Sequence, residues 1–358
     1  MDVMRPPILT IGKRFYRKNP IKQLDADEGP YQEEDQYMEE DVYADEVCDA
    51  FTQVEQTENG YRICLSVPSA YYGYIIGKKG ETRRRIENET RTQIRIPKQG
   101  EEGSVVIVGR DRKGVLSAKT RVDVLVDSAR QKQPFTHFLS FPMNSAEIKE
   151  AFAEFKEEVL QECDGDRGLD DTIFQNPDKL HLTIGTLALM NESEINTACN
   201  MLKQCKEDII DPLLRGIPLD VEIAGLEYMN DDPGAVDVLY AQVQLQDGSD
   251  RLQVLADRLV SKFTSTGLMQ KEHDRVKLHV TVMNTLMRKD PSGTSIPRGS
   301  NKGKIGINRE SFNAANVLRT CGNYSFGEFT IGELHLSQRY STGCDGYYAC
   351  AGKLELPT

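Results

Sequence analysis

Apolar residues follow helix and strand periods in two stretches of the chain. The first stretch, residues 58–131, predicts a strand, a helix, a turn, a second helix, two strands and a long helix. We expect the first strand at residues 61–67 and the last helix at about residues 112–130, where Val115, Ala118, Val122, Leu125 and Val126 share one face. Gln131-Lys132-Gln133-Pro134 ends this helix, because proline cannot continue a helical pattern.

The second stretch, residues 134–358, carries a loose internal repeat. A helix predicted to begin at Ser145 aligns Ile148, Phe152, Phe155 and Val159, and one predicted at Ser249 aligns Leu252, Leu255, Leu259 and Phe263 and stops at Gly267. Each is followed by a similar strand, K-L-H-L-T-I at 179–184 and K-L-H-V-T-V at 277–282. Further strands are expected at 135–141, 219–226, 236–245, 329–337 and 347–356, and an irregular loop at 287–307. The pattern predicts an α+β domain of two similar lobes.

The remaining residues, 1–57, are expected to form a disordered acidic tail. Residues 23–50 hold twelve aspartates and glutamates, three tyrosines and no lysine or arginine. Such a segment buries too little apolar area to fold by itself. Its twelve acids equal the formal net charge of −12, so the rest of the chain is formally neutral. Residues 58–130 are basic, with fifteen lysines and arginines against nine acids, a net of +6. A basic module beside an acidic tail indicates polyanion binding.

Composition excludes some classes of protein. The chain has no apolar run of about 18 residues, which a membrane-spanning helix needs, and no apolar core of a signal peptide near Met1. Its eight cysteines form no C-x-x-C pair, which argues against a zinc knuckle and for reduced, intracellular thiols.

A glycine turn, Gly77-Lys78-Lys79-Gly80, joins the two short helices of the first stretch. Glycine at both ends lets a sugar-phosphate backbone approach closely, the lysines supply charge for phosphates, and the following helix presents its N-terminus to the same anion. This arrangement clamps about four nucleotides of a single strand. The residues expected to bind nucleic acid are Ile76, Gly77, Lys78, Lys79, Gly80, Arg83, Arg84 and Arg95.

Residues 58–131 resemble the KH family of RNA-binding domains. The resemblance rests on I-I-G-K-K-G at 75–80, on Ile86 six residues later, and on the I-x-I-P strand that ends at Pro97. It implies the type I KH fold, with the long helix last. A KH fold used only for protein contacts is the alternative reading of the same stretch.

Two histidines are the candidate catalytic residues of the second stretch. In each K-L-H-Φ-T strand, where Φ is apolar, histidine and threonine project from the same face because side chains alternate along a strand. A neutral imidazole at one site can take a proton from an attacking hydroxyl, while a protonated imidazole at the other gives one to the leaving oxygen. Two hydroxyls can hold the phosphate oxygens. We therefore predict that His181, Thr183, His279 and Thr281 carry phosphodiester chemistry without a metal or another cofactor, because H-x-T offers too few zinc ligands.

Other readings of the histidines stay open at this point. His181 and His279 could be structural residues of half-buried strands. His335, in Leu334-His335-Leu336-Ser337, also fits H-x-[ST] and could replace one of them. His137 is a candidate to line the cleft, whereas His273 is expected in an exposed polar turn.

About residues 134–356 resemble the two-histidine phosphoesterase superfamily, and within it the central domain of certain A-kinase anchoring proteins. The supporting stretches are Pro134-Phe135-Thr136-His137-Phe138, Asn230-Asp231-Asp232-Pro233 and the run from Glu333 to Arg339. This resemblance implies a bilobal fold, with His181 and His279 as acid and base and Thr183 and Thr281 as phosphate ligands. It does not decide between cyclic phosphates, 2′,5′ linkages and RNA 3′ ends as substrates.

The order of the two domains behind an acidic tail resembles one subunit type of a nuclear, helicase-containing complex of transcription coactivation and DNA alkylation repair. This implies helicase-complex subunits as partners and a nuclear location. The leading hypothesis is an RNA-end phosphodiesterase guided by its own KH module. The alternatives are a non-catalytic RNA-binding adaptor whose cleft only holds a phosphate or nucleotide, and an anchoring protein that does not bind RNA.

Overall fold

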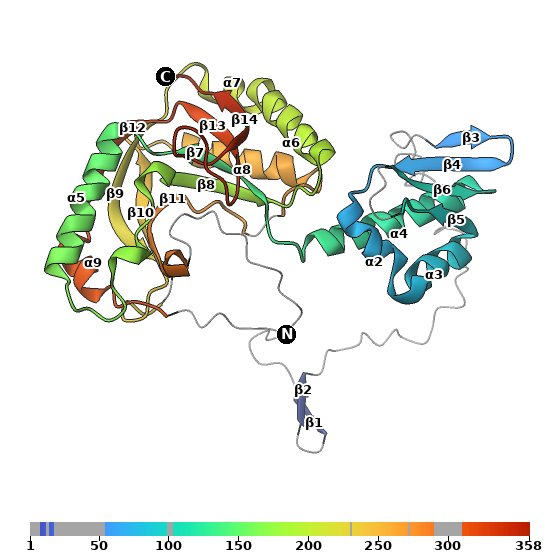
Figure 1. Ribbon diagram of the computed structural model, residues 1–358, viewed down its shortest axis with the longest axis horizontal. Coiled ribbons are helices and arrows are strands. Elements are labelled where there is room, and N and C mark those ends of the chain that lie inside the picture. The colour runs from blue at the N-terminus through green and yellow to red at the C-terminus, as the bar shows by residue number, and fades with distance from the viewer. Residues whose placement is uncertain are drawn as a thin grey trace, which may run out of the picture. The chain divides into compact units, whose positions relative to one another are not determined.

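The computed structural model describes residues 8–11, 14–17, 54–98, 103–229, 231–270, 273–289 and 310–358 (Figure 1). The chain divides into two units, Met1–Gln56 and Thr57–Thr358. The second unit contains both predicted folded domains. The whole acidic segment at 23–50, and residues 290–307 of the loop predicted at 287–307, lie outside the described residues.

Among the described residues of the predicted tail, 1–57, strands occur in two places: at residues 8–17 and at Glu55–Thr57. Strands β1 (Ile8–Ile11) and β2 (Arg14–Arg17) pair antiparallel, with Ile11 opposite Arg14. The two residues between them are Gly12 and Lys13, and glycine first in a two-residue connection is a hairpin signal. Composition did not predict this strand pair, because the stretch is short and basic and was averaged with the acidic residues that follow.

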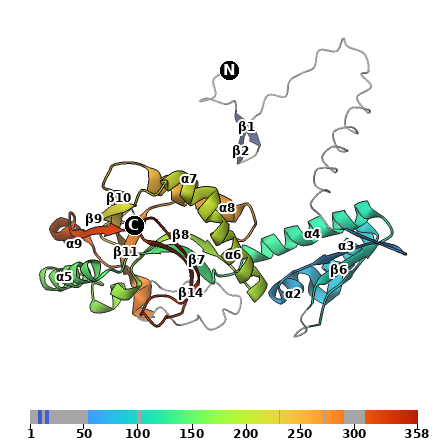
Figure 2. The same cartoon turned by 90° about the horizontal axis from the view of Figure 1, so that it is seen from above.

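The KH-like part of the chain is a four-stranded sheet covered by helices. Its strands are β3 (Glu55–Thr57), β4 (Gly60–Leu65), β5 (Thr92–Arg95) and β6 (Val105–Gly109), in the order β3-β4-β6-β5. Helices α2 (Tyr72–Ile76) and α3 (Glu81–Thr90) precede β5, and α4 (Arg112–Arg130) follows β6. Helix α4 contacts β4, β5 and β6, and Figure 2 shows it beside β6. From β4 onward the order of strands and helices matches the prediction, whereas β3 was not predicted. Helix α4 has the expected bounds, and Asp111 caps its first turn.

The larger domain is built on one eight-stranded sheet in the order β12-β9-β10-β11-β8-β7-β13-β14. The strands are β7 (His137–Pro142), β8 (His181–Leu187), β9 (Asp220–Tyr228), β10 (Val238–Leu245), β11 (His279–Asn284), β12 (Ser325–Thr330), β13 (Glu333–Gln338) and β14 (Cys350–Glu355). The two K-L-H-Φ-T strands are thus the two central ones, with three further strands on either side. This order realises the predicted repeat as two four-stranded halves.

Each half of the sheet carries its own helices. Helices α5 (Ala146–Glu162) and α9 (Ala315–Cys321) contact β12 and β9, whereas α6 (Glu192–Cys205) and α8 (Arg251–Thr264) contact β14 and β8 (Figure 1). Helix α7 (Asp211–Leu214) packs on α8. The predicted apolar faces of α5 and α8 are buried, so the helix periods gave the correct faces.

One predicted strand proved to be two. The apolar run at 329–337 is divided between β12 and β13 by Ile331 and Gly332. Strand β12 pairs with β9 at one edge of the sheet, while β13 lies between β7 and β14 in the other half. The sequence did not show that the chain changes its pairing strand here, because apolar residues continue across the two residues that separate β12 from β13.

Of the described residues, none belongs to a helix with the length and apolar character needed to cross a bilayer.

Candidate functional site

The two predicted histidines lie on adjacent strands at the middle of the sheet. Leu182 on β8 is paired antiparallel with Val280 on β11. The register that continues from this pair sets His181 opposite Thr281 and His279 opposite Thr183. Side chains alternate as predicted: Leu182 and Val280 are buried in the core, whereas the two histidines and two threonines are half-buried on the other face.

Each imidazole is held by the backbone of its own strand. The Nδ1 atom of His181 lies 2.7 Å from the carbonyl oxygen of Lys179, and Nδ1 of His279 lies 2.6 Å from that of Lys277. A carbonyl only accepts hydrogen bonds, so both Nδ1 atoms carry the proton. In the neutral imidazoles, Nε2 is therefore the basic nitrogen, which leaves it for proton transfer.

Burial favours the neutral form of both histidines. The pKa of His181 is lowered to about 4, mainly by burial; the hydrogen bond to the Lys179 carbonyl opposes this shift, and the neighbouring His279 adds a smaller contribution to it. Burial also lowers the pKa of His279, with a smaller contribution in the same direction from the charge of Lys277. At neutral pH both imidazoles are poised to accept protons, because desolvation penalises the imidazolium.

In each motif, one tyrosine ring contacts both the lysine and the histidine. The sequence did not predict these tyrosines. The Nζ atom of Lys179 lies 4.8 Å from the ring centroid of Tyr348, whose ring meets His181 edge-on at 5.4 Å. In the other half, Nζ of Lys277 lies 4.5 Å from the centroid of Tyr240, whose ring is 5.1 Å from that of His279. The repeat of sequence is thus a repeat of a lysine–tyrosine–histidine unit.

The two units differ in how their tyrosines are held. Tyr240 lies on β10 opposite Thr281, and its hydroxyl donates to Glu227 at 2.5 Å. Tyr348 belongs to the loop before β14. The buried Lys179 holds that loop in place, because its Nζ donates hydrogen bonds to Ser341 O and Thr342 Oγ1, each at 3.1 Å. The ring of Phe138, 5.1 Å from His181, completes the aromatic surroundings of that histidine.

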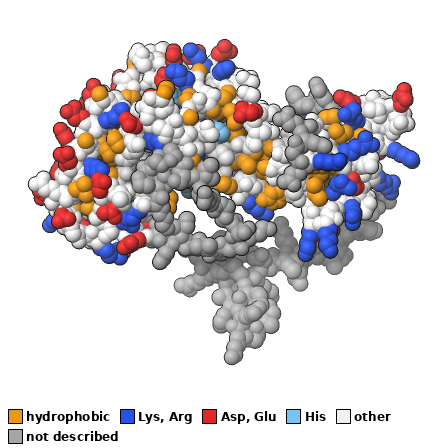
Figure 3. Space-filling view, viewed as in Figure 1, with side chains coloured by type: hydrophobic (Ala, Val, Ile, Leu, Met, Phe, Trp, Pro, Cys, Tyr) orange, Lys and Arg blue, Asp and Glu red, His pale blue; other side chains and the backbone are white. Residues whose placement is uncertain are grey.

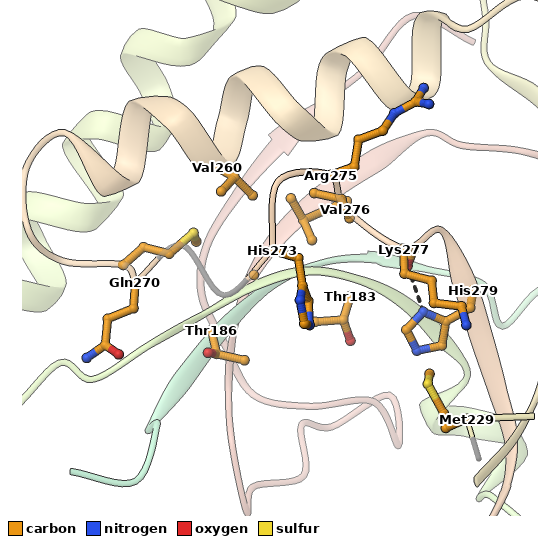
Figure 4. Close-up of a pocket in the computed structure, with 13 residues that line it drawn as sticks. Thr183, Thr186, Met229, Val260, Gln270, His273, Arg275, Val276, Lys277 and His279 are labelled. Atoms are coloured by element: carbon orange, nitrogen blue, oxygen red, sulfur yellow. Dashed lines mark hydrogen bonds between the residues drawn. The ribbon is translucent and has the colours of Figure 1, made fainter. Parts of the chain in front are cut away.

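A cavity of about 380 Å³ extends from the facing residues Thr183 and His279 (Figure 4). It follows β8 past Gly185 and Thr186 and reaches Gln270, between α8 and β11. His181 and Thr281 do not line it, so the cavity lies on one side of the histidine pair. None of these additional lining residues was predicted as part of the site.

The other three histidines are placed differently from one another. His335 lies on β13, is buried, and contacts Glu333 through Nε2 at 2.7 Å. The ring of Tyr347 lies 5.7 Å from that of His335 and 6.4 Å from that of His181, between the two histidines in the chain of ring contacts. His335 therefore contacts Glu333 and Tyr347, and Tyr347 separates it from His181. This position does not favour His335 as a replacement for His181.

The suggestion that His137 lines the cleft is wrong. Ser140 on β7 pairs with Thr183, and Phe138 contacts His181, so alternate side chains from 138 face the site. His137 points the other way, is buried, and lies beside Thr136 with Nδ1 2.9 Å from its hydroxyl. His273 is exposed as expected, but it also lines the cavity near Thr183.

The glycine turn of the KH-like part has the geometry that its sequence predicts. Gly77 has φ +70°, and a Cβ there would lie 2.1 Å from Oγ1 of Thr82. Gly80 has φ +77°, but a Cβ on it would meet nothing within 4 Å. The first glycine is required by packing within the turn, while the second leaves open space into which a backbone can approach.

The basic residues near this turn face solvent. Lys78, Lys79, Arg84 and Arg95 are exposed, and Ile76 and Arg83 are half-buried. Arg83 lies 3.6 Å from Glu87, which also accepts a hydrogen bond at 2.8 Å from the backbone of Ile94 on β5. Lysines and arginines gather over this part of the molecule in Figure 3. The predicted contact residues are thus brought together around α3 and β5.

No cluster of three or more histidine, cysteine, aspartate or glutamate side chains suited to a metal occurs among the residues that the structure describes.

Two family models match this chain. The AKAP7 2'5' RNA ligase-like domain matches residues 135–356, and the KH domain matches residues 62–123. Over 360 aligned residues the chain is 51% identical to activating signal cointegrator 1 complex subunit 1 of Mus musculus, with 99% of this chain and 100% of that protein covered. The chain belongs to the family of that subunit. This chain joins a KH domain to an AKAP7 2'5' RNA ligase-like domain, which confirms both resemblances and the mixed α+β fold predicted from the sequence.

Solved structures similar to parts of this family member include TT0787 of Thermus thermophilus, with 17% identity and a TM-score of 0.40 over 62% of this chain and 98% of that one. E. coli LigT complexed with NADP+ has 14% identity and a TM-score of 0.36, and covers 63% of this chain and 100% of its own. The first type I KH domain of human Vigilin has 23% identity and a TM-score of 0.19, over 20% of this chain and 78% of that one.

Proposed function

We propose that this protein binds single-stranded RNA through its KH domain and hydrolyses or cyclises a phosphodiester at an RNA end in its two-histidine cleft, without a metal. The observation that carries the proposal is that His181 and His279 project from the same face of two adjacent strands, each with Nδ1 bound to a backbone carbonyl and Nε2 left for chemistry. A pair of imidazoles with fixed tautomers on adjacent strands suits a reaction that needs one base and one acid.

His181 is the base of this proposal and His279 the acid. The pKa of His181, lowered to about 4 by burial, keeps its imidazole neutral across the working range of pH. His279 must be protonated when the substrate is bound. A phosphate anion in the cleft raises the pKa of an adjacent imidazole, because it stabilises the charged form.

The chemistry balances with these two groups. Nε2 of His181 takes the proton of an attacking water or ribose 2′-hydroxyl as its oxygen bonds to phosphorus. The bond from phosphorus to the leaving oxygen breaks, and that oxygen takes the proton from Nε2 of His279. Thr183 and Thr281 donate hydrogen bonds to the non-bridging oxygens, where charge accumulates. Proton exchange with water then restores both histidines.

The KH domain would supply the RNA. The exposed Lys78 and Lys79 and the open space beside Gly80 suit a phosphate backbone, which positions a strand without specifying its sequence. Base choice would depend on other contacts of the bound strand.

We also propose that the protein is a subunit of an activating signal cointegrator 1 complex, after the name of its mouse relative. The resemblance noted in the sequence extends this to a nuclear complex with a helicase, active in transcription coactivation and alkylation repair. Purification of the tagged protein from nuclear extract, with identification of bound subunits, tests this part separately from the chemistry.

The test of the activity uses RNAs that end in a 2′,3′-cyclic phosphate, a 2′,5′ linkage or a 3′-hydroxyl, incubated with the full-length protein and EDTA and followed by mass analysis. Turnover of one of them that is lost in His181→Ala and His279→Ala supports the proposal. Binding of these RNAs without turnover of any would favour an adaptor whose cleft only holds a phosphate or nucleotide.

A further inference from the structure

We propose that the cavity along β8 binds the nucleoside that carries the leaving oxygen, and that it recognises the base of that nucleoside. This rests on the proposed function, since it assumes that the phosphate lies between His181 and His279. The cavity begins at Thr183 and His279. Because His279 protonates the leaving oxygen, the group bound to that oxygen lies on the side where the cavity opens.

The size of the cavity suits one nucleoside. Its volume of about 380 Å³ lies near the lower end of the roughly 300–1,000 Å³ typical of small-molecule sites. Gln270 marks the end of the cavity that is farther from His279 in Figure 4. A single base and its ribose, attached to a phosphate at His279, therefore match the cavity better than a longer piece of chain.

The inner wall of the cavity is apolar, and a glycine in it, Gly185, leaves room for a neighbouring side chain. Val260 and Met269 are almost completely buried, and both line it together with Gly185. A Cβ on Gly185 would lie 2.6 Å from the sulfur of Met269, so the thioether occupies the space that any larger residue would need. Thioether sulfur makes favourable contacts with aromatic rings. This wall suits the face of a nucleobase.

The rim of the cavity is polar and carries positive charge. His273, Arg275 and Lys277 come from the segment that leads into β11, and Gln270 from the segment that follows α8. No aspartate or glutamate is found among the described residues of the lining. Arg275 extends away from the cavity in Figure 4 and lies 3.8 Å from Asp257, so Lys277 carries the positive charge nearer to the cavity. A cationic rim around an apolar wall suits a nucleotide, which joins an anion to a flat apolar ring.

Gln270 is the residue placed to read the base. It is exposed at the end of the cavity, and its amide offers both a donor and an acceptor to the edge of a base. A substrate that lacks the base cannot form these hydrogen bonds, and its kcat/KM should be lower by roughly ten-fold or more.

The experiment compares two RNAs that differ in their last residue, one with a base and one with an abasic ribose. We expect the full-length protein to cleave or open the base-bearing end with kcat/KM about ten-fold higher. Gln270→Ala and Gly185→Ala should reduce this preference and leave turnover of the abasic RNA unchanged. Gly185→Ala acts by pushing the flexible end of Met269 into the cavity. Gln246→Ala, an exposed glutamine outside the cavity, is the matched control.

Equal turnover of both RNAs by the wild type would overturn the inference, as would variants that lower both rates equally. If the protein turns over neither RNA, the proposed function fails and binding decides the inference. The protein with Lys78→Asp and Lys79→Asp, in which the KH turn is disabled, is titrated with nucleoside monophosphates and with ribose 5-phosphate. Tighter binding of nucleotides that is lost in Gln270→Ala supports the base site, and equal affinities for nucleotide and sugar phosphate reject it.

Discussion

Leu182 and Val280 face each other across the antiparallel contact between β8 and β11, and this single pairing brings the two H-x-T motifs together. Both side chains point into the core, so their neighbours at 181, 183, 279 and 281 all project from the opposite face. A shift of one residue in either strand would bury a histidine and expose a leucine or valine. Core packing therefore sets the register on which the site depends.

We predict that His181→Ala and His279→Ala each lower phosphodiester turnover by about 10²–10⁴-fold. The double variant should be scarcely slower than either single one, because acid and base act in one proton-transfer cycle and their effects are not additive. Steady-state rates on the best RNA substrate measure this.

His335→Gln is the comparison for these variants, because His335 bonds to Glu333 and is separated from His181 by Tyr347. It should retain most of the activity. Activity that survives in both alanine variants but disappears in His335→Gln would transfer the catalytic assignment to β13.

Reversal of the turn charges, Lys78→Asp with Lys79→Asp, should weaken RNA binding without unfolding the KH domain, since both side chains are exposed. If each lysine neutralises one phosphate, the slope of log affinity against log salt should fall by roughly 1.4 for single-stranded RNA. Fluorescence titrations at several salt concentrations measure both quantities. Lys203→Asp with Lys206→Asp changes the net charge equally at an exposed site on the other domain. An equal loss of affinity in that control would mean that net charge, and not the turn, binds RNA.

Glu194→Ala should destabilise the protein by about 3–5 kcal/mol, because it leaves a buried guanidinium without its partner. The carboxylate of Glu194 is paired with Arg130, the last residue of α4, and also accepts a hydrogen bond at 2.8 Å from the backbone of Met190. Arg130 donates to the carbonyl of Ala188 at 2.6 Å and lies 5.3 Å from the ring centroid of Tyr71. Urea unfolding measures the change in the free energy of unfolding.

Glu192→Ala is the control for this stability change, since Glu192 begins the same helix but is exposed. A surface substitution of this kind is expected within about 0.5 kcal/mol of the wild type. Similar losses in the two variants would show that the negative charge at the start of α6 matters, and not the ion pair.

Local pattern was sufficient to predict the strands that carry the site. Period-two alternation in K-L-H-Φ-T placed leucine and valine in the core and histidine and threonine on the other face, as the structure has them. Helix α4 could be delimited because its apolar face is regular and a proline follows it in the sequence. These features depend on neighbours only a few residues apart.

The surroundings of the histidines could not be predicted in the same way. Tyr348 reaches His181 from a loop more than 160 residues later, and Tyr240 reaches His279 from another strand of the sheet. The repeated lysine was visible in the motif, but its role depends on which ring lies beneath it. His137 was misplaced for a related reason, because a strand buried on both faces gives no alternation from which to infer direction.

The pH dependence of kcat/KM distinguishes the base from the acid. The rate should rise as pH increases through about 4, where His181 loses its proton, and fall as pH passes the pKa of free His279. Burial, and to a smaller extent the charge of Lys277, holds that second pKa below its usual 6.5, so the maximum should lie on the acid side of 6.5. Lys277→Gln removes a positive charge that disfavours the imidazolium, and should therefore move only the falling limb to higher pH. Lys277→Arg keeps the charge and should leave the limb in place. A rising limb that moves instead would exchange the roles of the two histidines, and a profile that neither substitution alters would mean that the charge of Lys277 does not act on the acid.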